Sequence, residues 1–249
     1  MMPSPLITII IAVYNGSDTL ERCLESIAKQ SFREFELILM DGGSTDGTLS
    51  IIEAYSDQVT YWESAADRGI YHAWNKALAH AQGEWVLFLG ADDRLHDEGA
   101  LERMLPHLES KSQHPLVYGK LRMEGAPYDG LVLGKPWNWR TFRRRMSIPH
   151  TAAFHHRKLF EEVGPYNESF RISADYELLL RKKIKLNPIF VDEFVTVMAA
   201  GGTSVNNATR SLEEARRAQV LHQVNSAFVI QAWHHYFHLR IALQRLKRS

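Results

Sequence analysis

Residues 35–48 read Phe-Glu-Leu-Ile-Leu-Met-Asp-Gly-Gly-Ser-Thr-Asp-Gly-Thr, an apolar run followed at once by a turn of glycine, serine and aspartate. The run at 35–40 predicts a buried strand that ends at Asp41. A second apolar run, at 85–89, is followed by the acidic pair Asp92-Asp93. Ligands of open parallel sheets bind outside the carboxyl ends of the strands, so we expect both acidic segments in one binding site.

These two segments together suit a nucleotide diphosphate. A glycine-rich turn lets the backbone approach a ligand closely, and adjacent carboxylates can hold a divalent cation. The pairing therefore predicts an enzyme that uses a nucleotide-activated sugar. Each signal alone is common, because an Asp-Gly-Gly turn is a frequent connection after a strand. The interpretation therefore depends on the order and spacing of several motifs.

The composition limits the class of protein. A chain of 249 residues is long enough for one large α/β domain, or for one domain with a small appendage. Lys+Arg and Asp+Glu are both 29, so no overall field favours nucleic acid. Two local basic stretches are either anion-facing patches or plain solvated surface. They contain Arg140, Arg143, Arg144 and Arg145 in the first, and Arg240, Arg245, Lys247 and Arg248 in the second.

Cysteine usage and hydropathy bear on the compartment. The single cysteine, Cys23, cannot form an internal disulfide, which fits a reducing compartment. The apolar run at 6–13 is too short for a signal sequence or a membrane span, and is typical of a central strand in a parallel sheet. We expect a cytoplasmic protein, and peripheral contact with the inner face of a membrane stays open.

The first hundred residues alternate between strand and helix patterns. Strands are predicted at 6–13, 35–40, 59–63 and 85–89, and helices at 17–29, 49–55 and 70–81. Ser17 or Asp18 is the expected cap of the first helix. Repeated β-α-β units with short connections imply a parallel sheet with right-handed crossovers.

The pattern loosens after Asp93. We expect helices at 98–108, 158–163 and 173–183, the last capped by Ser173, and extended segments at 116–122, 130–133, 152–156 and 189–198. Residues 136–149 are expected to form an aromatic and basic loop. From about Ser211 the tail predicts one long helix with two apolar sides, which needs two things to pack against. The first side contains Leu221, Val224, Phe228, Ala232, Tyr236, Leu239, Leu243 and Leu246, and the second contains Ile230, Trp233, Phe237 and Ile241.

The motifs occur in a recognisable order. They are Tyr14-Asn15, the Asp41 turn, Asp67-Arg68-Gly69 and Gly90-Ala91-Asp92-Asp93, then Pro149-His150-Thr151, Ser173-Ala174-Asp175-Tyr176-Glu177-Leu178 and Gly201-Gly202-Thr203-Ser204. This order resembles family 2 glycosyltransferases, the large inverting group on the GT-A fold, over roughly residues 5–205.

The resemblance implies an α/β architecture with a Rossmann-like, mostly parallel sheet flanked by helices. Its domain would span 1–208, with a nucleotide-binding half at about 5–95 and an acceptor and catalytic half at about 96–208. Residues 209–249 would form a C-terminal helical extension.

Roles follow for individual residues from the same resemblance. The nucleotide-binding residues would be Tyr14, Asn15, Asp41, Asp67, Arg68, Asn75 and Asp92. Asp41 would contact the base and Asp92 the ribose, and an ion pair between Arg68 and Asp67 is the alternative for Arg68. Asp93 would coordinate Mg²⁺ or Mn²⁺ at the diphosphate. The sequence departs from the family at Gly90, where the first acidic position of the metal motif is usual, and this leaves fewer charges around the metal.

Asp175 matches the family's general base. Near a helix N-terminus, its carboxylate would be stabilised as the anion and ready to accept a proton. Direct in-line attack by the acceptor hydroxyl would then invert the anomeric centre. Glu177 is the rival base. Both His150 and Glu177 are candidates for acceptor or phosphate contacts, although His150 is equally compatible with a packed core histidine.

The expected reaction is transfer of one hexose or N-acetylhexosamine to a glycan or lipid-linked acceptor, as in bacterial surface polysaccharide assembly. UDP is the favoured nucleotide, with dTDP and GDP left open. The Gln-x-x-Arg-Trp signature of processive synthases is absent from the sequence. A nucleotidyltransferase is the rival enzyme, but residues 14–18 lack the lysine of a basic phosphate loop. A non-catalytic scaffold of the same fold would be expected to lose Asp93 or Asp175. The second apolar side of the tail helix, Ile230, Trp233, Phe237 and Ile241, would contact a membrane or a second copy of the chain.

Overall fold

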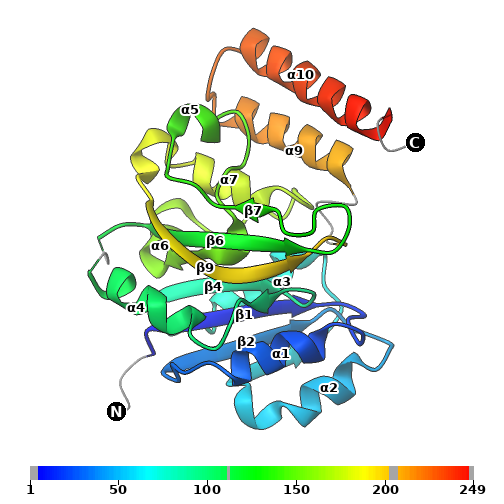
Figure 1. Ribbon diagram of the computed structural model, residues 1–249, viewed down its shortest axis with the longest axis vertical. Helices are drawn as coiled ribbons and strands as arrows, with labels where there is room; N and C mark the ends of the chain where they lie inside the picture. The colour runs from blue at the N-terminus through cyan, green and yellow to red at the C-terminus, as the bar shows by residue number, and fades with distance from the viewer. Residues whose placement is uncertain (1–4, 111–112, 202–206, 247–249) are drawn as a thin grey trace.

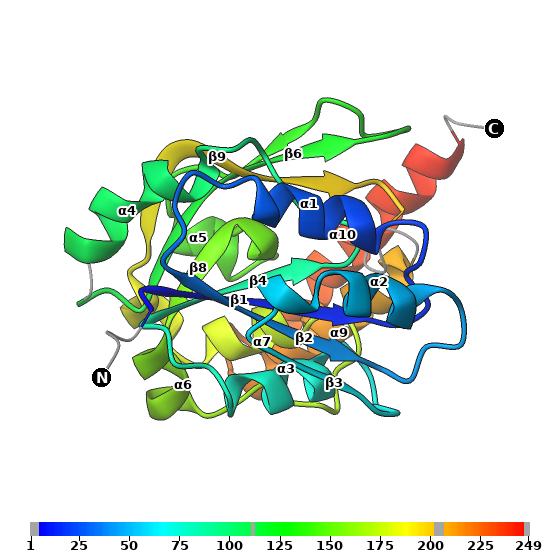
Figure 2. The same cartoon turned by 90° about the horizontal axis from the view of Figure 1, so that it is seen from below.

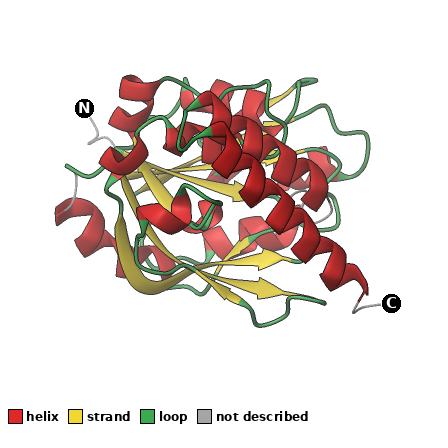
Figure 3. Cartoon of the chain, turned by 90° about the horizontal axis from the view of Figure 1, so that it is seen from above, coloured by secondary structure: helices red, strands yellow, loops and turns green. Residues whose placement is uncertain are grey.

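The computed structural model describes residues 5–110, 113–201 and 207–246, with side chains described through Arg240. Within these residues the chain forms a 9-stranded sheet in the order β3-β2-β1-β4-β8-β6-β9-β5, with β7 paired to β6. Helices cover both faces of the sheet, and the last helices of the chain lie beyond one end of it (Figure 1). The strands form one curled layer between the helices (Figure 3). The expected α/β architecture is confirmed.

The first four strands are parallel, as predicted. They are β1 (Ile7–Val13), β2 (Phe35–Asp41), β3 (Tyr61–Ser64) and β4 (Trp85–Gly90), connected by α1 (Leu20–Ala28), α2 (Thr48–Ala54) and α3 (Ile70–Leu78). Val13 pairs with Asp41, and Ala12 pairs with Gly90. The carboxyl ends of β1, β2 and β4 are therefore level, and the acidic segments that follow β2 and β4 start from one edge.

The second half makes the sheet mixed. Its elements are β5 (Arg94–Leu95), α4 (Ala100–Ser110), β6 (Leu116–Glu124), β7 (Val132–Leu133), α5 (Trp139–Phe142), β8 (Ala153–His156), α6 (Arg157–Val163), α7 (Ala174–Leu180) and β9 (Ile189–Ala199). Strand β8 runs antiparallel to both β4 and β6, whereas β6 and β9 are parallel. The parallel prediction therefore holds for the first half and for the β6–β9 pair.

Both faces of the central strands are buried, which explains their unbroken apolar runs. Along β1, Ile10 packs into one core with α3 and α7, while Ile9 and Ile11 pack into the other with α1 and α4. Figure 2 shows α1 and α4 on one side of the sheet and α3 and α6 on the other. Alternate residues point to opposite faces, so two helical layers enclose one strand.

One predicted helix cap is wrong, and the other is at the predicted position without the expected hydrogen bond. Helix α1 begins at Leu20 rather than near residue 17, and its N-cap residue Thr19 makes no capping side-chain bond. The Ser17 amide instead donates to Asp46 of the neighbouring turn. Ser173 is the N-cap residue of α7, as predicted, but its hydroxyl accepts from no amide of the helix and instead donates to the carbonyl of Ser211. In each case the residue bonds to a segment distant in sequence.

The predicted single tail helix is also wrong. The tail forms α9 (Ala208–Leu221) and α10 (Ala227–Leu246), and α10 packs back on α9 (Figure 1). The chain turns at Gln223, which has a left-handed φ of 49°. The reversal buries Val224 beside the core, so the turn is stabilised by packing that helical periodicity does not reveal. No helix in the described part of the chain is long and apolar enough to cross a membrane.

In α10 the buried apolar side is the one that was expected to be outward, and the exposed side is the other one. Ile230 is buried and Trp233 packs against the same core, although both belong to the side that was expected to face a membrane or a second copy. The other side is exposed at Phe228, Tyr236 and Leu239. Ile241 lies beyond the described side chains.

Candidate functional site

The turn after β2 lies against the segment before α3. The Gly42 amide donates to the carbonyl of Val13, which holds the turn at the end of β1. A Cβ placed on Gly42 would lie 2.9 Å from Asp67 Oδ2 and 3.4 Å from Tyr14 Cδ2. The structure therefore brings Tyr14, Asp67 and the Asp41 turn together. These are three of the positions that the sequence predicted for one nucleotide pocket. A side chain at position 42 would crowd this contact.

Asp41 is buried and its carboxylate is fully engaged inside the chain. It accepts from the amides of Gly43 (3.1 Å) and Ser44 (3.0 Å) and from the hydroxyls of Ser44 (2.5 Å) and Ser64 (2.6 Å). A carboxylate offers about four acceptor sites, so these donors nearly saturate it. Asp41 fixes the shape of the turn, and its contact with a base stays a prediction.

Asn15 and Asp46 connect the residues just after β1 to the Asp41 turn. Asn15 has a left-handed φ of 49°. Its side-chain oxygen accepts from the Thr45 amide at 2.9 Å, and its backbone N–H donates to the Ser44 hydroxyl at 2.7 Å. Asp46, which the sequence analysis did not single out, accepts from Thr48 and from the Ser17 amide. The Thr48 hydroxyl, together with backbone amides, holds the pKa of Asp46 well below its usual range.

The Asp67-Arg68 segment makes contacts that the sequence did not predict. Asp67 Oδ1 accepts from the Gly69 amide at 2.7 Å, while Arg68 pairs with Glu168 at 2.7 Å and not with Asp67. Asn75 also bonds to Glu168, and its amide group clamps the backbone N–H and C=O of Tyr166. Arg68 and Asn75 thus meet at Glu168, and this contact joins α3 and the segment before it to the loop before α7.

The two carboxylates after β4 surround Gly90. A Cβ on Gly90 would lie 2.7 Å from Asp92 Oδ1 and 3.0 Å from Asp93 Oδ2, so the missing side chain is what lets both carboxylates approach this point. Asp93 is buried, and its Oδ1 has no hydrogen-bond partner among the described residues. Burial and the charge of Asp92 raise the pKa of Asp93 to about 8. The described residues contain no cluster of three or more His, Cys, Asp or Glu side chains that could hold a metal ion.

Asp175 lies in the first turn of α7, next to α3. The Tyr71 hydroxyl donates to the carbonyl of Ile172 at 2.6 Å and lies 3.3 Å from Asp175 Oδ1. Burial raises the pKa of Asp175 to about 6, and the nearby charge of Glu214 adds to the rise. Loss of solvation therefore opposes the stabilisation that the helix N-terminus was expected to give the Asp175 carboxylate, and with this pKa the carboxylate is ionised mainly above pH 6.

Glu177 occupies another side of the same helix and has no free oxygen. Arg181 donates to both of its oxygens, at 3.1 and 2.5 Å, and His222 Nε2 lies 2.6 Å from Oε1. Burial raises the pKa of Glu177, but the hydrogen bonds from His222 and Arg181 outweigh it and hold the pKa below its usual range. This buried network anchors the tail to α7, so Glu177 is a structural ion-pair residue here.

His150 is surrounded by rings. Its imidazole stacks on Phe88 with centroids 5.5 Å apart and lies 5.0 Å from Trp74 and 4.9 Å from His155. Neither ring nitrogen has a hydrogen-bond partner among the described residues, and burial holds the pKa of His150 well below its usual range. The surroundings fit the packed histidine, and a contact with phosphate or acceptor stays a prediction. Residues 202–204 of the last motif lie outside the described residues.

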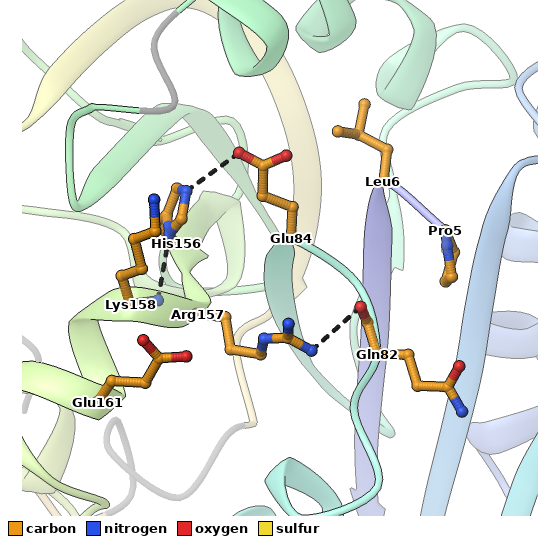
Figure 4. Close-up of a pocket in the computed structure, with 8 residues that line it drawn as sticks. All are labelled: Pro5, Leu6, Gln82, Glu84, His156, Arg157, Lys158 and Glu161. Atoms are coloured by element: carbon orange, nitrogen blue, oxygen red, sulfur yellow. Dashed lines mark hydrogen bonds and ion pairs between the residues drawn. The ribbon is translucent and has the colours of Figure 1, made fainter. Parts of the chain in front are cut away.

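A cavity of about 440 Å³ opens at the opposite edge of the sheet (Figure 4). It is lined by Leu6, just before β1, and by Glu84, which pairs with His156 at 3.1 Å. Arg157 donates to the carbonyl of Gln82 on the same wall at 3.1 Å. These residues mark the amino ends of the parallel strands, so this cavity is separate from the site formed by Asp41, Asp67 and Asp93.

The chain matches the protein family described as Glycosyl transferase family 2 over residues 8–159. It is 35% identical over 202 residues to a PGL/p-HBAD biosynthesis glycosyltransferase of Mycobacterium bovis, which covers 80% of this chain and 77% of that protein. It is 28% identical over 193 residues to an uncharacterized glycosyltransferase of Mycobacterium tuberculosis, with 77% of this chain and 74% of the relative covered.

Solved structures show the same fold. The S. aureus TarS fragment 1–349 in complex with UDP-GlcNAc matches with a TM-score of 0.69 and 19% identity, over 91% of this chain and 70% of that chain. The mannosyltransferase PcManGT from Pyrobaculum calidifontis, in complex with GDP-Man and Mn²⁺, matches with a TM-score of 0.67 and 20% identity, over 94% of this chain and 71% of that chain. Of a longer TarS chain, this chain spans 39% of the length. The expected GT-A fold is confirmed.

Proposed function

Since the chain belongs to glycosyltransferase family 2 and is a glycosyltransferase, we propose that it moves one hexosyl or N-acetylhexosaminyl group from a nucleotide diphosphate sugar to a glycan or lipid-linked acceptor, with inversion. One observation carries the proposal. Helix α3 begins at Ile70, just after the segment that carries Asp67, and Asp67 contacts the Asp41 turn. The first turn of α3 carries Tyr71, which contacts Asp175. The predicted donor site and the predicted base are therefore held by one short helix.

We propose UDP as the nucleotide of the donor. Support comes from the TarS structures, one with UDP and one with UDP-GlcNAc, whereas PcManGT was solved with GDP-Man. The exposed ring of Tyr14 beside Asp67 offers a surface for a base, and the turn held by Asp41 forms the wall of the same pocket. The remaining proposed nucleotide contacts are Asn15, Arg68, Asn75 and Asp92. Glu168 bonds to both Arg68 and Asn75 and would hold them in place.

The residues after β4 fit a divalent cation, Mg²⁺ or Mn²⁺. Asp93 holds a buried oxygen with no partner among the described side chains, and burial and Asp92 raise its pKa, so a neighbouring cation would favour both carboxylates. Asp93 would coordinate the cation and Asp92 would lie beside it. A bound cation supplies Lewis acidity and neutralises the charge of the departing diphosphate.

Asp175 would act as the general base. As the acceptor hydroxyl oxygen bonds to the anomeric carbon, the bond from that carbon to the diphosphate breaks, and the hydroxyl proton passes to the Asp175 carboxylate. A pKa of about 6 suits this duty near neutral pH, because the carboxylate is mostly ionised yet basic enough to accept a proton. Tyr71 would hold the carboxylate in place through its contact with Oδ1.

We further propose that the exposed side of α10 rests on a membrane that carries the acceptor, at its cytoplasmic face. Phe228, Tyr236 and Leu239 form this side in the described part of the helix, and Phe228 is 84% exposed. Arg240 stacks its guanidinium over Tyr236, with 5.9 Å to the ring centroid, which places a positive charge beside the apolar side. An apolar face flanked by positive charge suits anionic lipid.

The test of the proposed function is a donor screen. Wild-type protein is incubated with UDP-, dTDP- and GDP-sugars in Mg²⁺ or Mn²⁺, and release of nucleoside diphosphate is measured, with slow hydrolysis as the readout when no acceptor is present. Release from one UDP-sugar, lost in Asp175→Asn when acceptor is supplied, supports the proposal. Release from none of the sugars, or release only from dTDP- or GDP-sugars, refutes the proposed donor.

A further inference from the structure

The loop before α7 is held by a carboxylate from the tail. The backbone amides of Arg171, Ile172 and Ser173 all donate to Glu214 of α9. The Arg171 amide lies 3.0 Å from each carboxylate oxygen, and the amides of Ile172 and Ser173 lie 2.8 and 3.0 Å from Oε2. Successive amides that converge on one carboxylate fix the course of the backbone, since each donor is satisfied only in that geometry.

Glu214 is well placed to hold this loop. Its side chain is buried, and Arg210, one helical turn earlier, approaches Oε1 at 3.4 Å. The Ser173 hydroxyl adds a second link by donating to the carbonyl of Ser211. Hydrogen bonds to a charged acceptor are stronger than neutral ones, so Glu214 is the main connection between α9 and the loop.

The same loop determines where Asp175 lies. The carbonyl of Ile172 receives the Tyr71 hydroxyl at 2.6 Å, and that hydroxyl lies 3.3 Å from Asp175 Oδ1. Arg171 reaches the start of α3, where its Nη1 would be 2.8 Å from a Cβ on Gly69. A shift of residues 171–173 would therefore move Asp175 relative to both Tyr71 and the predicted nucleotide turn.

We propose that Glu214 is a positioning residue for Asp175, so that α9 is part of the active-site scaffold and not an appendage that follows the catalytic domain. The inference rests on the proposed function, because it assumes that Asp175 is the base. It also places the functional end of the domain beyond residue 208, at least as far as α9.

Glu214 has a second, electrostatic effect on the base. The groups that face Asp175 are Tyr71 on α3, Tyr166 on the loop after α6, and Glu214 on α9. After burial, which is the largest cause, the charge of Glu214 raises the pKa of Asp175, against hydrogen bonds from Tyr71 and the local backbone that lower it. Removing the Glu214 charge should lower the pKa of Asp175 and move the acid limb of the rate profile to lower pH.

The experiment measures kcat, donor KM and the pH profile of kcat for full-length Glu214→Gln and Glu214→Asp. The matched control is Glu213→Gln, which makes the same charge change at the exposed neighbouring position. For Glu214→Gln we expect kcat to fall about 10-fold or more with little change in donor KM, since misplacing a catalytic group costs rate more than binding. Its acid limb should shift to lower pH. Glu214→Asp keeps the charge on a shorter side chain, so it should keep the wild-type limb and lose rate.

The outcomes separate this inference from the function on which it rests. Wild-type kcat and an unshifted limb in folded Glu214→Gln would overturn the inference. Should that variant fail to fold, wild-type kcat in Glu214→Asp overturns it instead. Asp175→Asn is measured beside them: near-normal transfer by that variant refutes the base assignment itself, whereas an inactive Asp175→Asn with fully active Glu214 variants refutes only the positioning role.

Discussion

The pH dependence of transfer gives the sharpest test of Asp175 as the base. Burial raises its pKa to about 6 from an ordinary value of 3.8. Only the ionised carboxylate can accept the acceptor's proton, so activity should be present above this pKa and lost as the pH falls through it. At pH 5 the ionised fraction is roughly one-tenth, so the rate should be about 10-fold below its plateau and should fall about 10-fold per further pH unit. An Asp with an ordinary pKa would keep full activity at pH 5.

The assay is nucleoside diphosphate release at saturating metal and donor, from pH 4.5 to 8, with donor affinity measured by calorimetry at each pH. Asp175→Asn should lose about 10²–10⁴-fold in kcat at the plateau and retain donor binding, because the amide keeps the size of the side chain but accepts no proton. Glu177→Gln is the matched control. It should keep the acid limb, since Glu177 is engaged by Arg181 and His222. A flat profile down to pH 5, or near-normal transfer by Asp175→Asn beside a folded, inactive Glu177→Gln, would refute the assignment.

Three further outcomes are expected. Asp41→Ala should weaken UDP binding by roughly 1.5–3 kcal/mol. It should also lower the melting temperature, because the internal donors to Asp41 lose their acceptor. Unchanged UDP affinity by calorimetry in the folded variant would remove Asp41 from the site. UDP affinity should rise with Mn²⁺ or Mg²⁺, and Asp93→Ala should abolish the rise. Equal wild-type transfer in excess chelator would contradict a role for metal. Serine substitutions at Phe228, Tyr236 and Leu239 together should reduce co-sedimentation of the full chain with anionic vesicles, whereas a wild-type dimer that ignores such vesicles would indicate that this side of α10 packs between subunits.

Asp41 shows how far local patterning reaches. The apolar run before it predicted β2, and the register of β2 on β1 confirmed that Asp41 lies at the carboxyl edge of the sheet. The sequence did not reveal that Asp41 accepts from Ser64 at the end of β3 as well as from its own turn. Periodicity reports whether a residue is buried, and not which distant donor completes its hydrogen bonds.

Asp175 and Glu177 show the same limit on α7. Their motif indicated two acids at a helix start, and nothing in the spacing distinguished an acid with a raised pKa from an acid within an ion-pair network. The difference comes from His222 and Glu214, which lie about forty residues further along the chain and reach α7 only after the tail folds back. Desolvation and pairing depend on these contacts, so a pKa is a property of the tertiary structure.

The sequence by itself determined the alternating strands and helices of the first half and the acidic segments at the ends of β2 and β4. These features depend on the period of side-chain burial along a local segment, which is written in consecutive residues. Only the tertiary structure decided that the tail turns at Gln223, that α9 supplies Glu214 to the loop before α7, and that Phe228 rather than Trp233 faces outward. Those outcomes depend on which surface each segment meets, because a helix with two apolar sides can bury either one.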